Sequence, residues 1–139
     1  MSEAPETATD QTTSVAPLLS VRNGRQAVEF YKAALRARVL FRHDDPQGAV
    51  VAQLAVGKSA FWLADESPEH FNFSPETLGG GTSRMIVIVD DPDAACEQAV
   101  AAAAKVVWPV GDQSYGWRAG RIVDPFGHHW EIGKPLTGT

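Results

Sequence analysis

Hydrophobic positions in this chain follow two periods, and the periods alternate in the same order in each half. In the first half, a short apolar segment at 16–21 predicts a strand, and apolar residues at helical spacing from Arg25 onward predict an amphipathic helix. Apolar runs separated by turn residues then predict strands at 39–41, 49–56 and 59–64. The first half therefore has the order βαβββ.

The second half repeats this order after a segment at 65–81 that contains two prolines and three consecutive glycines. A strand is predicted at 84–89 and a helix at 93–104, with Asp91 as its N-cap and Pro92 at its first helical position. Three further strands are predicted, at 106–108 (ended by Pro109), 115–123 and 128–133.

The repeat defines the domain organisation. An offset of 68 residues superposes Val21 on Val89, although the repeat rests on element order more than on identities. The first fifteen residues are rich in Ser, Thr, Ala, Glu and Pro and have little to bury. We therefore predict a disordered tail at 1–15 and one domain at 16–139, made of modules 16–64 and 82–134 and the linker 65–81.

Composition narrows the possible functions. The 139 residues carry a formal net charge of −5, and Glu3, Glu6 and Asp10 account for three of these charges. The nearly neutral remainder argues against partners such as nucleic acid or an anionic membrane. We see no apolar run near the ~20 residues of a membrane helix and no secretory signal, and the one cysteine, Cys96, excludes an intramolecular disulfide. We expect a cytoplasmic protein.

The stretch 115–132, YGWRAGRIVDPFGHHWEI, carries the candidate chemistry. Its sequence Asp-Pro-Phe-Gly at 124–127 predicts a turn, because proline presets φ and glycine supplies a positive φ. In the strand that follows, alternation directs Trp130 to one face and Glu131 to the other. Trp130 is expected in the core, so Glu131 is either solvated or directed into a polar pocket.

DPFGHHWEI resembles the C-terminal signature of the vicinal oxygen chelate superfamily, which includes glyoxalase I, bleomycin-resistance proteins and extradiol dioxygenases. With the preceding YGWRAG, it is most similar to the PhnB-like branch. The resemblance covers 17–134. It implies an α+β fold in which two βαβββ modules with curled mixed sheets are related by a pseudo-twofold axis and form a cleft. It also implies a homodimer.

The resemblance places Glu131 at the last of four metal-ligand positions of the metal-dependent members. The other positions fall on Ala16, Gln53 and Arg84. Ala16 and Arg84 cannot bind a metal, and Arg84 places a permanent cation where the metal would lie. We therefore expect no metal or other cofactor, with a divalent metal as the alternative.

Aromatic residues supply the remaining candidates for the cleft. Trp62 shares strand parity with Ala60 and Ala64, and Trp117 follows a Tyr-Gly turn. These tryptophans either form an aromatic rim for a planar ligand or simply pack against neighbouring side chains. Trp108 is interpreted as core, like Trp130. The predicted ligand-binding residues are Gln53, Trp62, Arg84, Tyr115, Trp117, Arg118 and Glu131.

Other reactive residue types have structural interpretations. His128 and His129 are adjacent, so they face opposite ways on a strand, and they are interpreted as a pair at the end of a turn with one half buried. Cys96 is interpreted as a small buried residue of the helix. The glycines at 79–81 are interpreted as a hinge or flexible loop, because no strand precedes them and no helix follows directly.

Three functions remain open. The first is a metal-free small-molecule binding protein that holds an aromatic or amphipathic ligand between the modules. The second is a metal-dependent lyase, isomerase or dioxygenase, and the third is a metal-free enzyme with Glu131 as general base. Because the positions of Arg84 and Glu131 converge on one metal in the metal-dependent relatives, we also predict a direct, bidentate ion pair between these two residues.

Overall fold

The computed structural model describes residues 13–136, so most of the tail predicted at 1–15 lies outside the described residues. The first module begins with strand β1 (Leu18–Val21) and helix α2 (Gly24–Leu35). Its remaining strands are β2 (Arg38–Asp44), β3 (Val50–Val56) and β4 (Ser59–Asp65). A 3-10 turn, η1 (Pro68–His70), and a short helix, α3 (Pro75–Leu78), follow before the second module.

The second module consists of β5 (Arg84–Ile88), α4 (Pro92–Ala101), β6 (Lys105–Asp112), β7 (Trp117–Val123) and β8 (His129–Pro135). Each module forms one four-stranded mixed sheet, with the strand orders β1-β4-β3-β2 and β5-β8-β7-β6. The first strand pairs in parallel with the last, and the other pairs are antiparallel. The predicted α+β fold of two βαβββ modules is therefore confirmed, and neither sheet closes into a barrel.

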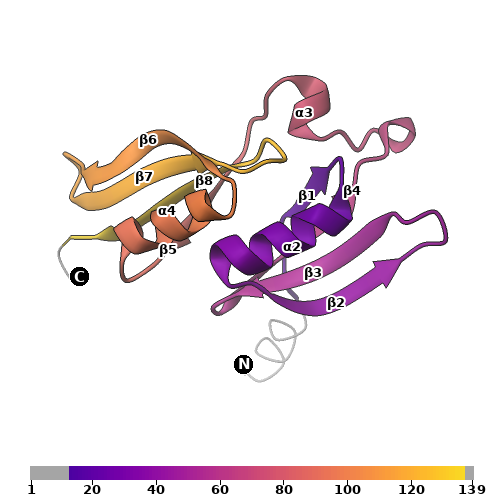
Figure 1. Cartoon of the computed structure of the whole chain (residues 1–139), viewed down its shortest axis with the longest axis horizontal. Helices are drawn as coiled ribbons and strands as arrows, with labels where there is room; N and C mark the ends of the chain where they lie inside the picture. The colour runs from indigo at the N-terminus through magenta and orange to yellow at the C-terminus, as the bar shows by residue number, and fades with distance from the viewer. Residues whose placement is uncertain (1–12, 137–139) are drawn as a thin grey trace, which may run out of the picture.

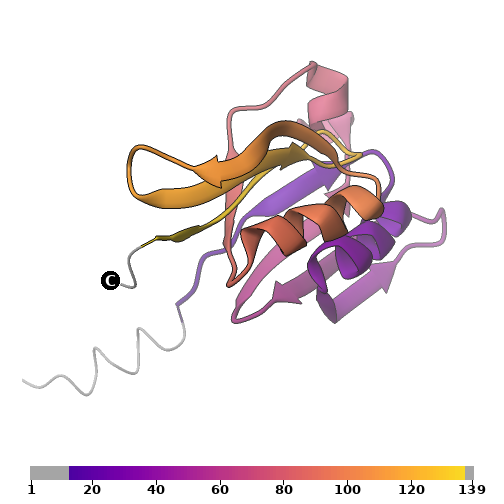
Figure 2. The same cartoon turned by 60° about the vertical axis from the view of Figure 1, so that its left-hand side comes forward.

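Helices α2 and α4 lie side by side and join the modules, as Figures 1 and 2 show. The side chain of Gln98 in α4 donates a hydrogen bond to the carbonyl oxygen of Ala33 in α2, at 2.9 Å. Both helices contribute to a single hydrophobic core that also takes residues from both sheets. Each helix covers one face of its own sheet, and we call the opposite face the open face.

A buried carboxylate fixes the turn that was predicted at 124–127. Oδ1 of Asp124 accepts hydrogen bonds from the backbone N–H groups of Phe126 and His128, both at 2.9 Å. Oδ2 accepts from Trp130 Nε1 at 2.9 Å and from the hydroxyl of Tyr31 at 2.5 Å. Asp124 is 4% exposed, so these four donors replace the water that the carboxylate loses on burial.

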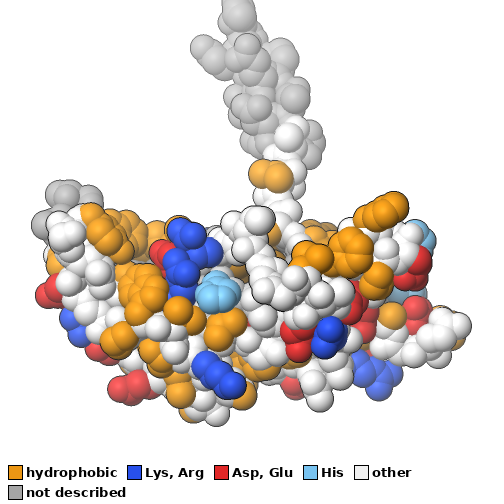
Figure 3. All heavy atoms as spheres, turned by 90° about the horizontal axis from the view of Figure 1, so that it is seen from above, with side chains coloured by type: hydrophobic (Ala, Val, Ile, Leu, Met, Phe, Trp, Pro, Cys, Tyr) orange, Lys and Arg blue, Asp and Glu red, His pale blue; other side chains and the backbone are white. Residues whose placement is uncertain are grey.

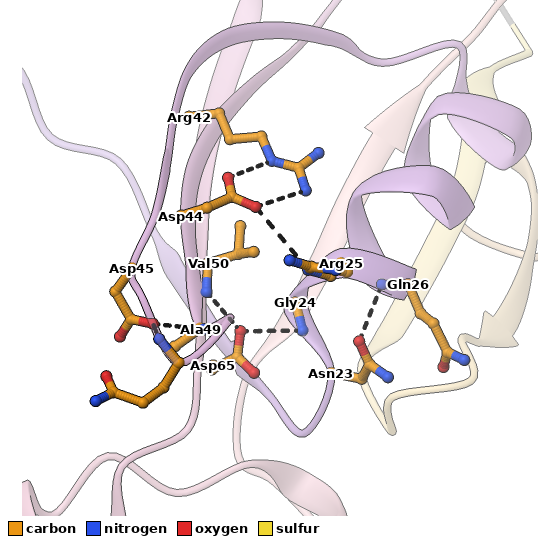
Figure 4. Close-up of polar contacts among 11 residues, drawn as sticks. Asn23, Gly24, Arg25, Gln26, Arg42, Asp44, Asp45, Ala49, Val50 and Asp65 are labelled. Carbon is orange, nitrogen blue, oxygen red and sulfur yellow. Dashed lines mark hydrogen bonds and ion pairs between the residues drawn. The ribbon is translucent and has the colours of Figure 1, made fainter.

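A second carboxylate has a similar role in the first module (Figure 4). Oδ1 of Asp65, at the end of β4, accepts from the backbone N–H of Gly24 at 3.1 Å and from that of Val50 at 2.9 Å. It thereby joins the start of α2 to the start of β3. The side chain of Asn23 caps the helix by accepting from Gln26 N at 3.1 Å.

The predicted boundaries of the second module differ most from the structure at the ends of β6 and α4. Strand β6 does not end at Pro109 but continues to Asp112. It tolerates the proline because β6 is an edge strand and its register with β7 shifts between Trp108 and Gly111, where the missing N–H costs no ladder bond. Helix α4 ends at Ala101 rather than at 104, and Ala103 adopts a positive φ of 105° in the turn that follows.

Candidate functional site

Glu131 lies on the open face of the second sheet, as strand alternation predicts. Its neighbours Trp130 and Ile132 are 3% and 1% exposed on the helix-covered face. In the pairing register, Glu131 stands between Ile86 of β5 and Arg121 of β7. The site is therefore assembled across three strands of one module.

The predicted ion pair between Arg84 and Glu131 is present, but it is not bidentate. Nε of Arg84 lies 2.8 Å from Oε2 of Glu131. The same oxygen accepts a second bond, at 3.0 Å, from an Nη of Arg121, a residue absent from the predicted set. We refer to Arg84, Arg121 and Glu131 as the Glu131 cluster, which contains two cations and one anion.

The sequence carried one signal for Arg121. Arg121 and Trp117 differ by four positions in β7, so strand alternation directs both to one face. In the structure, the antiparallel register then places Arg121 directly opposite Glu131. Its guanidinium lies 5.6 Å from the ring centroid of Trp108. Trp108 is therefore partly exposed on the open face and packs on a cation, and its assignment to the core is wrong.

The open face of the second sheet also carries a small apolar recess beside the cluster. The recess holds about 160 Å³ and is lined by Ile86, Tyr115, Trp117, Ala119, Glu131 and Gly133. Three of the predicted ligand-binding residues therefore come together here. Trp117 supplies a partly buried indole, whereas Tyr115 is 62% exposed.

Gln53 and Trp62 lie together on the open face of the first sheet. The register aligns Leu18, Trp62, Gln53 and Phe41 across its four strands. The ring centroids of Phe41 and Trp62 are 5.9 Å apart, so the two aromatic side chains contact each other although their strands lie on either side of β3. These residues form an aromatic surface separate from the Glu131 cluster.

The registers also show which positions of the two modules correspond. Leu18 pairs with Trp62, and Ile86, which is 68 residues after Leu18, pairs with Glu131. Trp62 therefore corresponds to Glu131, and the placement of Gln53 at the equivalent ligand position does not hold. Between residues 13 and 136, no three His, Cys, Asp or Glu side chains are grouped so that they could hold a metal ion.

A divalent metal does not fit the donor chemistry of this site. Oε2 of Glu131 already accepts hydrogen bonds from two guanidinium groups. Both groups are permanent cations, which repel a metal ion. The corresponding position of the first module holds an indole, which is no metal ligand.

Arg118 lies away from the open face. It belongs to the opposite parity of β7, and its guanidinium binds both carboxylate oxygens of Asp93, at 2.7 and 2.9 Å, and Asp112 at 2.9 Å. Hydrogen bonding to Asp93 is the main cause that raises the pKa of Arg118, and the same bond lowers the pKa of Asp93. This residue anchors the start of α4 to β6 and β7.

A cavity of about 620 Å³ lies between the modules, and we call it the intermodule cavity. Strand β1 contributes Leu18 and Ser20, residues 73–78, which we call the α3 segment, contribute Phe73 and Leu78, and the second module contributes Arg84 and Arg121. His128 and His129 also line it. Of the predicted ligand-binding residues, Arg84 alone lines this cavity.

The two adjacent histidines differ in their partners. Nε2 of His128 donates to the carbonyl oxygen of Ser20 at 2.8 Å, which links β1 to the second module. Nδ1 of His129 and Nε of Arg121 are buried and have no hydrogen-bond partner among residues 13–136. Cys96 is buried in α4 as predicted, and burial is the main cause that raises the pKa of its thiol.

Basic and histidine side chains gather near the middle of the face shown in Figure 3, with hydrophobic side chains beside them. The protein thus has a two-module α+β fold with a charged cluster on the second sheet. A model of the Glyoxalase/Bleomycin resistance protein/Dioxygenase superfamily matches residues 11–132, and the chain belongs to this superfamily.

Relatives in sequence include uncharacterized proteins of two mycobacteria. Rv0887c of Mycobacterium tuberculosis is 35% identical over 127 residues, which cover 88% of this chain and 75% of that protein. Mb0911c of Mycobacterium bovis is 35% identical over a match that covers 88% of this chain and 84% of that protein. No helix among the described residues is long and apolar enough to cross a membrane.

Solved structures share the fold over almost the whole chain. The product of Arabidopsis thaliana gene At5g48480 superposes with a TM-score of 0.71 at 26% identity, covering 88% of this chain and 98% of that one. TioX from Micromonospora gives 0.67 at 24% identity, with coverages of 91% and 99%. FosX, a fosfomycin resistance protein of Listeria monocytogenes, gives 0.70 at 11% identity, with coverages of 91% and 95%.

Proposed function

We propose that this protein binds a small aromatic or amphipathic molecule without the metal used by metal-dependent relatives. The observation that carries the proposal is the double occupation of Glu131 Oε2 by Arg84 and Arg121. The guanidinium groups of Arg84 and Arg121 lie where a metal ion would bind Glu131, so its carboxylate orients two arginines instead of a metal. The motifs YGWRAG and DPFGH support membership of the PhnB-like branch, and the single cysteine supports a cytoplasmic location.

The aromatic surfaces of the two open faces support a planar ligand. Trp117 lines the recess next to Glu131, and Trp62 lies against Phe41 on the other sheet. Indole rings offer large, rigid contact areas to flat apolar groups. A cation beside such a surface suits an amphipathic molecule with one apolar and one polar end.

A homodimer is part of this proposal. Ile86 and Ile88 of β5 are 64% and 62% exposed on the open face of the second sheet, and Phe41 is 49% exposed on that of the first. A second copy covering these side chains would remove apolar surface from water, and paired identical chains usually form closed twofold dimers. Sedimentation that remains monomeric at high micromolar concentration contradicts the dimer.

Tryptophan fluorescence and metal analysis test the proposal. The planar quencher 4-nitrobenzamide should quench emission in a saturable way, and the quench should decrease in Trp117→Phe or Trp62→Phe. If both variants retain the full quench, the ligand does not bind on these surfaces. The purified protein should also bind no stoichiometric nickel or zinc, and metal uptake with histidine ligation contradicts a metal-free site.

A further inference from the structure

The intermodule cavity differs in charge from the rest of this acidic protein. The chain carries a formal net charge of −5, yet the cavity is lined by Arg84, Arg121, His128 and His129. None of the described residues that line it is Asp or Glu. A cavity with cations on its wall and no acid concentrates positive potential locally.

The Glu131 cluster leaves hydrogen-bonding capacity unused at the wall of this cavity. Within residues 13–136, Arg84 donates only through Nε, so both of its Nη groups remain available, and its side chain is 51% exposed. Glu131 neutralises one of the two guanidinium groups, which leaves an excess positive charge. Its carboxylate also holds the two groups side by side, since both donate to the same oxygen.

We infer that the intermodule cavity binds the anionic group of a small organic acid, a carboxylate or a phosphonate, through Arg84 and Arg121. The inference rests on the proposed small-molecule function and names its ligand class. Guanidinium groups bind carboxylate and phosphoryl oxygens through paired, charge-assisted hydrogen bonds. Thr82 and Ser83, which directly precede Arg84, also line the cavity, and a hydroxyl group is a hydrogen-bond donor.

The apolar part of the ligand also has a place in this cavity. Leu18, Phe73 and Leu78 line the side formed by β1 and the α3 segment. The cavity volume of about 620 Å³ falls within the range of small-molecule sites. Glu131 is a positioning residue in this arrangement, because it orients the arginines and does not line the cavity.

Matched pairs of probes test the charge requirement. The probes 4-nitrobenzoate and 4-nitrophenylphosphonate carry the anions, and 4-nitrobenzamide is the neutral counterpart of the carboxylate. Binding is measured by calorimetry, because no tryptophan is among the described residues that line the cavity. The anions should bind about tenfold more tightly than the amide, and their advantage should shrink as salt is raised. The preferred anion identifies which of the two acids the cavity suits.

Arg84→Gln should remove the tighter binding of the anionic probes. The affinity for both anions should fall about tenfold, and the affinity for the amide should not change. Arg84→Lys should retain part of the tighter binding. The control is Arg38→Gln, which also removes one positive charge but lies in β2, where Arg38 donates to the carbonyl oxygen of Gly57. Circular dichroism should show that all three variants fold.

The outcomes separate this inference from the proposed function. Equal binding of anions and amide, or equal effects of Arg84→Gln and Arg38→Gln, overturns the inference alone. Binding of acetate or inorganic phosphate that depends on Arg84, with no gain from the nitrophenyl group, supports the anion site and overturns aromatic ligand binding. If none of the probes binds at millimolar concentration, both are wrong.

Discussion

The hydroxyl of Tyr31 lies 2.5 Å from Oδ2 of Asp124, and this buried hydrogen bond joins helix α2 of the first module to the β7–β8 turn of the second. Tyr31 is 0% exposed, and its ring packs edge-on against Phe61, with ring centroids 5.3 Å apart. The same Asp124 oxygen also accepts from Trp130. The bond therefore couples the module interface to the strand that carries Glu131.

Tyr31→Phe should lower the free energy of unfolding by about 1–3 kcal/mol. The substitution keeps the ring but removes one donor from a buried carboxylate, which is costly to leave with fewer partners. Chemical denaturation followed by circular dichroism measures the loss. Tyr115→Phe is the control, because Tyr115 is 62% exposed, and its effect should stay within about 0.5 kcal/mol. Equal stabilities of the two variants contradict this role of Tyr31.

Alkaline pH should destabilise the wild-type protein more than Tyr31→Phe. Burial, followed by the neighbouring charge of Asp124, raises the pKa of Tyr31 well above its usual value. The unfolded chain releases the tyrosine proton near its ordinary pKa of about 10, so this contribution to stability is fully present below that pH. It is lost as pH rises from there through the higher pKa of the folded state. Denaturation midpoints between pH 8 and 11 should therefore converge for the two proteins, and parallel curves contradict the prediction.

Gly24→Ala should destabilise the first module. A Cβ at this position would lie 2.3 Å from Oδ1 of Asp65, so the carboxylate that joins α2 to β3 would have to move. Overpacking of this kind costs about 1–3 kcal/mol. Gly80→Ala is the matched control, because a Cβ there meets no atom within 4 Å. Thermal denaturation should show a lower midpoint for Gly24→Ala alone.

Glu131→Gln should reduce stability by about 1–2 kcal/mol, because it leaves Arg84 and Arg121 close together without their shared anion. The expected loss of stability is modest because water screens the half-exposed side chain of Arg84, although that of Glu131 is only 18% exposed. Glu76→Gln, in the exposed helix α3, should change stability by less than about 0.5 kcal/mol. An unchanged thermal midpoint in Glu131→Gln would show that the cluster adds nothing to folding.

High salt should reduce the difference in unfolding free energy between the wild-type protein and Glu131→Gln. Ions screen the attraction between the half-exposed Arg84 and its carboxylate, while they affect the less exposed bond from Arg121 less. Unfolding free energies at low and at about 1 M sodium chloride measure this change. A difference that stays constant would assign the effect to packing rather than to charge.

Local patterns in the sequence were enough to predict the order of elements and the faces of strand residues such as Trp130 and Glu131, although not the face of Trp108. These properties depend on local periods, so the two βαβββ modules, the turn at 124–127 and the burial of Trp130 could all be predicted. The pair of Arg84 with Glu131 was also predicted, from the positions at which a metal binds in related proteins.

Most contacts between residues of neighbouring strands could be found only in the folded structure. Register and long-range pairing follow from how whole modules pack, and they placed Arg121 on Glu131, Trp108 beside Arg121, and Arg118 on Asp93. The irregular register of edge strand β6 allowed it to continue through Pro109, although local propensity ends the strand there. The intermodule cavity is likewise a product of packing, because β1, β5 and the β7–β8 turn meet around it and lie far apart in sequence.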